Sequence, residues 1–395
     1  MEQMTSKVRL QAAMRHEPVD HLPLTIEGVC HGWAKFANDR YPDKFERARF
    51  YAELGLDGGI MYGSPVEPLP DGVEVREWAE QNERGETVLH KEYLTPAGTL
   101  QQVVRCTDDY QPLEAGWTPG SQHLPIFSDH HVPPTRSQRY LVETAEDLDS
   151  LEYLFGTLNP RAFDPFVQSL QAARGFCDEQ QILLSMYAAG VGDPLMWMSG
   201  VERTLLMAMQ EKDAFRRYVD IVARWNRQTI ELALDAGVDH IVRRGWSEST
   251  DFWSPTLYRE FLLEPLRQDV ALAHEAGVTV DYVMASGSAP LLDMLVSTGI
   301  DMLSNLDPLA PGTDLRAYRE QIGADVALCG GVNNYVVLEA GTEAETRQAT
   351  LEAIEAFTPP TGCVLAPSDC LFLGDPALVE RNVRVMIDTW KEAAW

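Results

Sequence analysis

Short apolar runs alternate with helical segments along most of this chain, and the alternation constrains the fold more than any other feature. Eight of the runs have the length and the glycine or proline boundaries of buried strands. They cover residues 22–29, 57–63, 182–187, 239–246, 278–285, 301–306, 326–331 and 362–370. Helical spacing follows most of them, at residues 44–54, 215–234, 255–275, 289–298, 314–322, 342–357 and 376–391. Strands joined by crossover helices are parallel, so the sequence predicts an α/β fold, a TIM (β/α)8 barrel.

The alternation breaks between the second and third runs. Residues 87–94 alternate polar and apolar side chains, a Thr-Pro-Ala-Gly turn follows at residues 95–98, and residues 99–105 are again rich in β-formers. This pattern is typical of a β-hairpin. We therefore expect a single barrel domain over residues 1–395, with a β-rich insertion after strand 2 at about residues 66–140.

The insertion carries several histidines, namely His90, His123, His130 and His131. A metal cluster is one interpretation of them. Their irregular spacing favours a solvated loop instead.

Charge and composition exclude some classes of partner. The chain has 60 Asp and Glu against 32 Lys and Arg, a formal net charge of -28, and it contains no long basic block. We expect no nucleic acid or membrane partner, a small-molecule substrate, and leave a homodimer open. No apolar signal core or run of about 18 apolar residues is present, and the six cysteines are scattered, so we expect a cytoplasmic protein with reduced thiols.

Barrel enzymes keep their chemistry at the carboxyl ends of the strands, an edge that we call the mouth. The side chains expected there are Glu27, Cys30, His31, Tyr62, Tyr187, Trp246, Glu248, Asp251, Asp281, Tyr282, Met284, Ser286, Asn305, Asp307, Cys329, Asn333, Asp369 and Cys370. The candidate catalytic residues are Tyr187, Glu248, Asp281 and Tyr282. The candidate substrate-binding residues are Glu27, His31, Tyr62, Trp246 and Asn333.

Two of these residues, Cys329 and Cys370, occupy the same point of two successive strand units. Catalytic zinc takes Cys, His and carboxylate ligands, commonly three from the protein. Cys329 and Cys370 with Glu248, or with Asp281 in its place, would supply such a set. Cysteine is also a common core residue, which is the alternative interpretation. No Gly-x-Gly-x-x-Gly or Gly-Lys-Ser/Thr loop supports nucleotide binding.

Three stretches of the chain resemble the uroporphyrinogen decarboxylase superfamily, which includes zinc methyltransferases that serve corrinoid proteins. They are residues 9–23 (RLQAAMRHEPVDHLP), residues 254–261 and 273–277 (SPTLYREF and AHEAG), and residues 329–333 (CGGVN). The resemblance spans nearly the whole chain and implies a TIM barrel.

The chain departs from this family's motifs at two places. The loop after the first strand, residues 27–33, has no arginine, whereas the decarboxylases hold their tetrapyrrole carboxylates with an arginine-rich loop there. The His-x-Cys-Gly zinc motif of the methyltransferases would fall on residues 284–287, which read MASG. The third zinc ligand of these methyltransferases, a cysteine in the loop of the last strand, is matched by Cys370 or is displaced one place by Asp369.

The resulting hypothesis is a methyltransferase that moves a methyl group from a small methoxylated or methylated substrate to a corrinoid protein, with zinc assistance and with the cobalamin carried by that partner. The aromatic mouth favours a neutral or cationic substrate. A decarboxylase is the first alternative, for which Arg243 and Arg244 supply cations near the mouth. A small-molecule-binding barrel without catalysis is the second.

Overall fold

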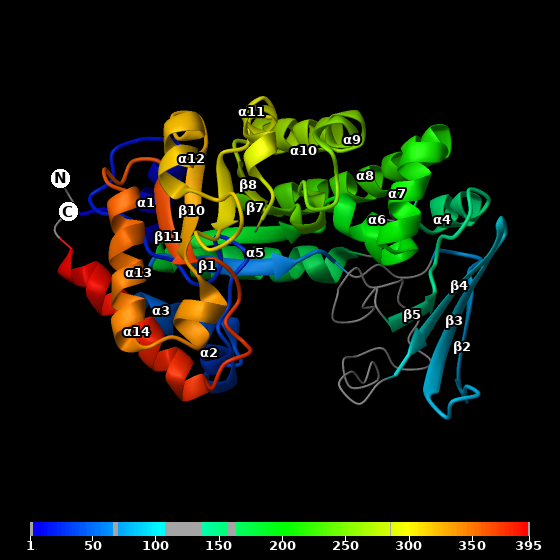
Figure 1. Ribbon diagram of the computed structural model, residues 1–395, viewed down its shortest axis with the longest axis horizontal. Helices are drawn as coiled ribbons and strands as arrows, with labels where there is room; N and C mark the ends of the chain where they lie inside the picture. Colours follow the sequence, from blue (N-terminus) through cyan, green and yellow to red (C-terminus); the bar gives the residue numbers. More distant parts are fainter. Residues whose placement is uncertain (1–2, 66–69, 107–135, 156–162, 285, 394–395) are drawn as a thin grey trace.

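A seven-stranded parallel sheet forms the centre of the computed structural model, which describes residues 3–65, 70–106, 136–155, 163–284 and 286–393. The strand order is β1-β6-β7-β8-β9-β10-β11 (Figure 1). The strands are β1 (Gly59–Gly63), β6 (Leu183–Ala188), β7 (His240–Arg244), β8 (Thr279–Val283), β9 (Met302–Leu306), β10 (Ala327–Val332) and β11 (Cys363–Pro367). All neighbouring pairs are parallel. The predicted α/β class, with a curled sheet of TIM-like type, is confirmed.

Residues 22–29, the expected first strand, contact the sheet through isolated bridges. Leu24 pairs with Leu365 of β11, and Thr25 pairs with Asp57 just ahead of β1. Thr25 N donates to Leu365 O at 3.0 Å, and Asp57 N donates to Leu24 O at 2.9 Å. This segment therefore lies between the two edge strands of the sheet, where the first strand of a TIM-like barrel belongs.

Helices lie around the central sheet, except for α4, which lies beside the insertion (Figure 1). They are α1 (Ser6–Met14), α2 (Lys35–Arg40), α3 (Lys44–Glu53), α4 (Asp147–Phe155), α5 (Asp164–Gln180), α6 (Gly192–Ser199), α7 (Val201–Gln210), α8 (Lys212–Asp235), α9 (Pro255–Phe261), α10 (Leu263–Glu275), α11 (Leu292–Val296), α12 (Leu315–Ile322), α13 (Glu343–Ala356) and α14 (Pro376–Glu392). The helix expected at 255–275 is divided into α9 and α10 at Leu262, and the one expected at 289–298 begins as a 3₁₀ turn. Among the described helices, none has both the length and the apolar character that a membrane span requires.

The insertion contains a second, antiparallel sheet in the order β2-β3-β4-β5. Its strands are β2 (Glu74–Gln81), β3 (Thr87–Thr95), β4 (Gly98–Arg105) and β5 (Ser137–Arg139). The expected hairpin is β3 and β4, whose last pair is Thr95 with Gly98. This sheet lies at the end of the molecule away from the two chain termini (Figure 1). His90 is in β3, whereas His123, His130 and His131 lie outside the described residues.

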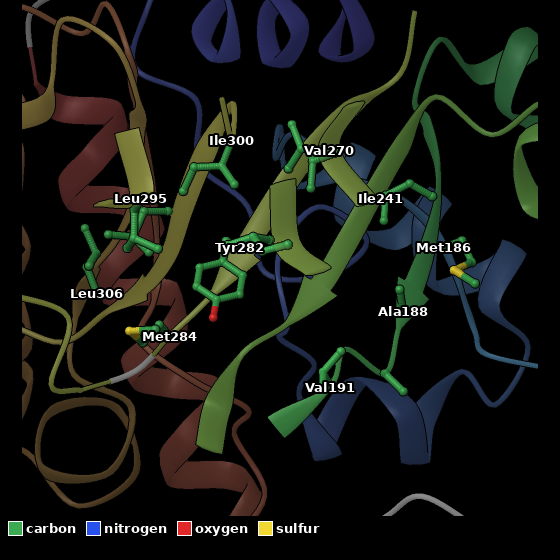
Figure 2. Packing of buried hydrophobic residues seen from close by; sticks show 14 of the residues in the cluster. Met186, Ala188, Val191, Ile241, Val270, Tyr282, Met284, Leu295, Ile300 and Leu306 are labelled. Carbon is green, nitrogen blue, oxygen red and sulfur yellow. The ribbon is translucent and has the colours of Figure 1, made fainter. Parts of the chain in front are cut away.

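Alternation along the strands divides the buried side chains into two groups. The inner group lies inside the curled sheet and packs against α1. It includes Cys30, Leu183, Met302, Ala327, Cys329, Val364 and Ala366. The outer group fills the space between the sheet and the helices, and Figure 2 shows Tyr282 of β8 among its apolar side chains. Because successive strand residues point to opposite faces, adjacent positions fall into different groups.

Candidate functional site

Two loops that are distant in sequence meet at the mouth. One follows the first strand segment and carries His31, and the other follows β11 and carries Asp369 and Cys370. An isolated parallel bridge between Ala34 and Leu371 joins the two loops. The meeting of the first and last loops of the barrel therefore builds this part of the site.

His31, Asp369 and Cys370 form a group suited to a metal ion, with ligand atoms within 4.8 Å of one another. Sγ of Cys370 lies 3.9 Å from Nδ1 of His31, and Oδ1 of Asp369 lies 3.8 Å from the same nitrogen. Imidazole, carboxylate and thiolate are all zinc ligands. Within the ranges that the structure describes, no other three His, Cys, Asp or Glu side chains are grouped in this way.

Burial raises the pKa of both acidic members of the group. The pKa of the Asp369 carboxyl is raised by desolvation, and the pKa of the Cys370 thiol is raised by desolvation and by the neighbouring Asp369. Metal ligands of these types bind in their deprotonated forms. A cation at this point would therefore offset the burial that keeps the thiol protonated.

Aromatic rings hold the His31 imidazole in place. The ring of Tyr187 stacks on it with centroids 5.0 Å apart, and the ring of Trp246 meets it edge-on at 5.2 Å. Tyr187 and Trp246 were predicted as mouth residues, and the structure places both beside His31.

Arg244 lies against two tryptophan rings at the mouth. Its guanidinium carbon lies 4.8 Å from the ring centroid of Trp197 and 5.4 Å from that of Trp246. Its Nε lies 3.1 Å from Oδ1 of Asp193, which is fully buried and accepts a hydrogen bond of 2.8 Å from the Ser247 hydroxyl. The mouth therefore contains a fixed cation.

Cys329 is not part of the metal-suited group. Its side chain points into the barrel interior, where a hydrogen bond with the Cys30 thiol and complete burial raise its pKa. Cys30 and His31 are adjacent and point in different directions, so Cys30 joins the interior while His31 reaches the mouth. The predicted ligand set thus shares Cys370 with the observed group.

Asp281 lies in the barrel interior, as alternation along β8 requires. Its Oδ2 accepts a hydrogen bond of 2.6 Å from the Ser304 hydroxyl, and its Oδ1 has no partner among the described residues. Desolvation raises the pKa of this fully buried carboxyl well above its usual range. Burial therefore favours the neutral form of the Asp281 carboxyl.

Glu248 and Tyr282 lie elsewhere, which corrects the prediction that both face the mouth. The Glu248 carboxylate accepts hydrogen bonds from the backbone N of Val191 (3.1 Å) and Gly192 (2.8 Å), and from the Tyr282 hydroxyl (2.5 Å). It also forms an ion pair of 2.6 Å with Arg243. This network is buried on the outer face of the sheet, so Glu248 is not available as a metal ligand beside Cys370.

Two candidate substrate-binding residues also contact helices. The Tyr62 hydroxyl donates to the Ser169 carbonyl oxygen at 3.0 Å, and the Lys44 ammonium lies 3.0 Å from the Tyr62 ring centroid. Glu27 forms an ion pair of 2.8 Å with Arg47 of α3. These contacts anchor the first loops to α3 and α5.

Asn333, another candidate substrate-binding residue, caps the π-helical turn Asn334–Glu339 that follows β10. Its side-chain oxygen accepts from Val336 N at 2.6 Å, and its side-chain nitrogen donates to Asp307 at 2.8 Å. Asn333 therefore positions this turn.

The same π-helical turn holds the loop of Asp369 and Cys370. Asn334 donates from Nδ2 to the Cys370 carbonyl oxygen at 3.2 Å. Oε1 of the buried Glu339 accepts from the backbone N of Phe372 (2.5 Å) and Leu373 (3.1 Å). Such turns are frequent at functional sites. Here the turn fixes both ends of the ligand-bearing loop.

Comparison with known proteins assigns the family. Residues 134–393 match the family "Uroporphyrinogen decarboxylase (URO-D)". The chain belongs to the uroporphyrinogen decarboxylase family. This match covers more than half of the chain and confirms the resemblance found in the sequence.

A solved structure of this general fold covers the whole chain. A methyltransferase from Methanosarcina mazei superposes with a TM-score of 0.62 over 98% of this chain and 100% of its own, at 17% sequence identity. A D-psicose 3-epimerase from Clostridium cellulolyticum H10 gives 0.38 over 57% of this chain and 84% of its own, at 11% identity. The similarity to the methyltransferase shows a shared fold. The similarity to the epimerase is too weak to support an argument.

Three residues of the site were not assigned these positions by the sequence. His31 was expected to bind substrate, and Asp369 was expected at the mouth, but neither was placed in a metal-suited group with Cys370. Arg244 was considered with Arg243 only as a cation for an acidic substrate. Alternation along residues 239–246 predicts that at most one of these two arginines faces inward, because adjacent strand residues point to opposite faces.

Proposed function

We propose that this protein is a methyltransferase that moves a methyl group from a small methoxylated or methylated substrate to a corrinoid protein. The observation that carries the proposal is the group of His31, Asp369 and Cys370 at the mouth, with ligand atoms within 4.8 Å of one another. Family membership and the fold shared with a methyltransferase support it.

The donor set fits zinc. One imidazole, one carboxylate and one thiol are the three kinds of protein ligand that zinc takes, and a three-ligand site leaves a coordination position for substrate. By resemblance Cys370 matches a zinc cysteine of the family, and in this proposal His31 and Asp369 take the place of the ligands that are missing at residues 284–287. A bound ion would supply Lewis acidity to the heteroatom that carries the methyl group.

The protein's own residues orient the reactants. Tyr187 and Trp246 fix the His31 ring, and the π-helical turn fixes the loop of Asp369 and Cys370. In the transfer, the bond between methyl carbon and heteroatom breaks, and the heteroatom keeps the electron pair. The Co(I) acceptor provides the pair for the new bond. Holding both reactants at one mouth removes much of the entropic barrier.

Exposed apolar residues on the mouth loops support a protein acceptor. They are Phe252 (37% exposed), Leu309 (57%), Tyr335 (55%) and Leu373 (66%), on the loops after β7, β9, β10 and β11. Exposed apolar side chains on several loops at one end of the strands favour an interaction surface there. The sequence itself contains no Asp-x-His-x-x-Gly loop of a cobalamin domain, so a separate corrinoid protein is proposed.

A methyl-transfer assay tests the proposal. The zinc-loaded protein is mixed with methoxylated and methylated compounds and with Co(I) corrinoid, and methylcobalt formation is followed by absorbance. We expect the rate of methylcobalt formation to fall at least about 100-fold in His31→Ala and in Cys370→Ser. Removing a residue that only supports a metal ligand lowers activity about 10- to 100-fold, and removing the ligand itself should have a larger effect. Cys106→Ser, whose thiol lies beside the insertion sheet, is the control. Equal rates in all variants would rule out this metal site.

A decarboxylase is the second candidate, because Arg244 offers a carboxylate-binding cation at the mouth. Release of CO₂ from uroporphyrinogen or a smaller acid, with no methyl transfer, would favour it. Absence of both activities and of bound metal would favour a small-molecule-binding barrel.

A further inference from the structure

The backbone just before His31 is held by side chains inside the curled sheet. The Ser185 hydroxyl of β6 donates to the Gly28 carbonyl oxygen at 2.7 Å, and Nε2 of His240 in β7 lies 3.0 Å from the Val29 carbonyl oxygen. Since a carbonyl oxygen only accepts, His240 donates from Nε2. Val29 belongs to the inner group of buried residues, so this stretch of the chain crosses the barrel interior on its way to the mouth.

Asn305 of β9 makes the corresponding contact at His31 itself. Its Nδ2 donates to the His31 carbonyl oxygen at 3.0 Å. Three strands, β6, β7 and β9, therefore each supply one side chain to a different carbonyl oxygen of one short segment. The bond from Asn305 is the one that reaches a member of the metal-suited group.

Asn305 occupies an unfavourable position. Its φ of +62° lies in the left-handed region, which asparagine tolerates better than most residues but which glycine adopts freely. Its side chain is buried, and its Oδ1 has no hydrogen-bond partner among the residues that the structure describes. Both features lower stability. What asparagine supplies here and glycine cannot is the amide N–H that meets His31.

The ring and the main chain of His31 are held from different elements. Tyr187 and Trp246 contact the ring, whereas Asn305 contacts the main chain. A functional constellation has to be held within about 0.5 Å of its productive geometry. Because Nδ1 of His31 lies 3.9 Å from Sγ of Cys370, a shift of the main chain would change the separation of these two ligand atoms directly.

We infer that Asn305 is a positioning residue for the metal-suited group, whose amide sets the His31 main chain so that the imidazole can share an ion with Asp369 and Cys370. Contacts that support a metal ligand contribute about 10- to 100-fold to metal affinity. The inference rests on the proposed function for the presence of the ion, whereas the placement of His31 can be measured without it.

Asn305→Gly separates positioning from folding. Glycine adopts this backbone without strain and cannot donate to His31, so the midpoint of thermal unfolding of the metal-free protein should stay close to that of the wild type. Zinc affinity, measured by chelator competition, should nevertheless fall about 10-fold. The visible absorption bands of the Co²⁺-loaded protein, which report ligand geometry, should shift. In Asn305→Ala the left-handed backbone stays strained, so both zinc affinity and the unfolding midpoint should fall.

Gln181→Gly is the matched control. Gln181 is also a non-glycine residue in the left-handed region, with φ of +55°, but it follows α5 and precedes β6, at the opposite end of the strands from the mouth. This change should leave zinc affinity and the Co²⁺ bands as in the wild type. Asn305 and Gln181 thus share a backbone conformation and differ in their contact with His31.

The metal-free protein gives a further readout. The imidazole signals of His31 in nuclear magnetic resonance depend on its position against the Tyr187 and Trp246 rings, so they should shift in Asn305→Gly and stay unchanged in Gln181→Gly.

The outcomes separate this inference from the proposed function. Zinc affinity that is unchanged in Asn305→Gly, or that falls equally in Gln181→Gly, makes the inference wrong even where methyl transfer occurs. If zinc affinity and the His31 signals change only in the Asn305 variants but no methylcobalt forms with the wild type, the positioning role stands and the methyltransferase proposal fails. A wild type that binds no zinc contradicts both.

Discussion

Asp281 and Tyr282 are consecutive residues of β8, and their side chains lie on opposite faces of the sheet. Asp281 faces the interior, where Ser304 donates to it, and Tyr282 donates to Glu248 among the outer residues. The barrel therefore separates two polar systems. The inner one leads to the mouth, and the outer one, with Arg243, joins the sheet to the helices.

The first prediction concerns the outer network. Glu248→Gln should lower the free energy of unfolding by about 3 kcal/mol, because it breaks a buried ion pair and leaves Asp269 as the remaining carboxylate partner of Arg243. Denaturant unfolding followed by circular dichroism measures the change. Glu264→Gln removes an exposed ion pair with Arg267 and should cost less than about 1 kcal/mol. Equal effects of the two changes would contradict a structural role for the Glu248 network.

The second prediction concerns pH. Burial lowers the pKa of His240 to about 4, against 6.5 for the unperturbed side chain. Between these values the unfolded state binds more protons, so stability rises with pH and is lost as pH falls from 6.5 towards 4. His240→Gln should reduce the slope of unfolding free energy against pH in this window by about 1 kcal/mol per pH unit.

His274→Gln is the matched control for this slope. The His274 side chain is 42% exposed and pairs with Asp301, so it offers an exposed histidine for comparison with the buried His240. An unchanged slope in His240→Gln would show that other groups carry the acid sensitivity.

The third prediction concerns metal content. Wild-type protein equilibrated with zinc and dialysed should retain about one ion per chain, and His31→Ala or Cys370→Ser should retain much less, because each removes one of three ligands. Elemental analysis and chelator competition measure this. Cys329→Ser should bind zinc as the wild type does. Loss of zinc in Cys329→Ser with retention in Cys370→Ser would point to a different ligand set.

The fourth prediction concerns the loop that carries Asp369 and Cys370. Glu339→Ala removes the acceptor of two backbone N–H groups in that loop and should cost about 1–3 kcal/mol. Amide hydrogen exchange at Phe372 and Leu373 should become faster, and zinc affinity should fall about 10-fold. Glu339→Gln keeps an acceptor oxygen and should stay close to wild type. If both variants bind zinc normally, the loop does not depend on this contact.

Much of the fold could be predicted from local pattern, because each strand and helix is specified by a short segment. The register of the insertion hairpin followed from the turn at residues 95–98, and the parallel sheet followed from alternation of strands and helices. His31, Tyr187 and Cys370 lie at or just past strand ends, and the structure brings these three residues together.

The members of the metal-suited group could not be predicted from position along the strands alone. Both Cys329 and Cys370 are near strand ends, yet Cys329 is still within β10 and faces the interior. The pairing of β10 with β9 also shifts register between Leu328 and Gly330, which short sequence patterns do not reveal. The contact of His31 with Cys370 depends on the approach of two loops more than 300 residues apart.

The bridges of Leu24 and Thr25 mark a seam where the beginning and the end of the chain complete the curled sheet. His31 lies on one side of this seam and Cys370 on the other, with Trp390 of α14 donating from its indole to the Leu22 carbonyl oxygen nearby. An ion held between these loops would act as a crosslink closing almost the entire chain into a loop. Binding of the ion would then also stabilise the fold. Heating the protein, or removing the ion with a chelator, would open the barrel first at the loops of His31 and Cys370.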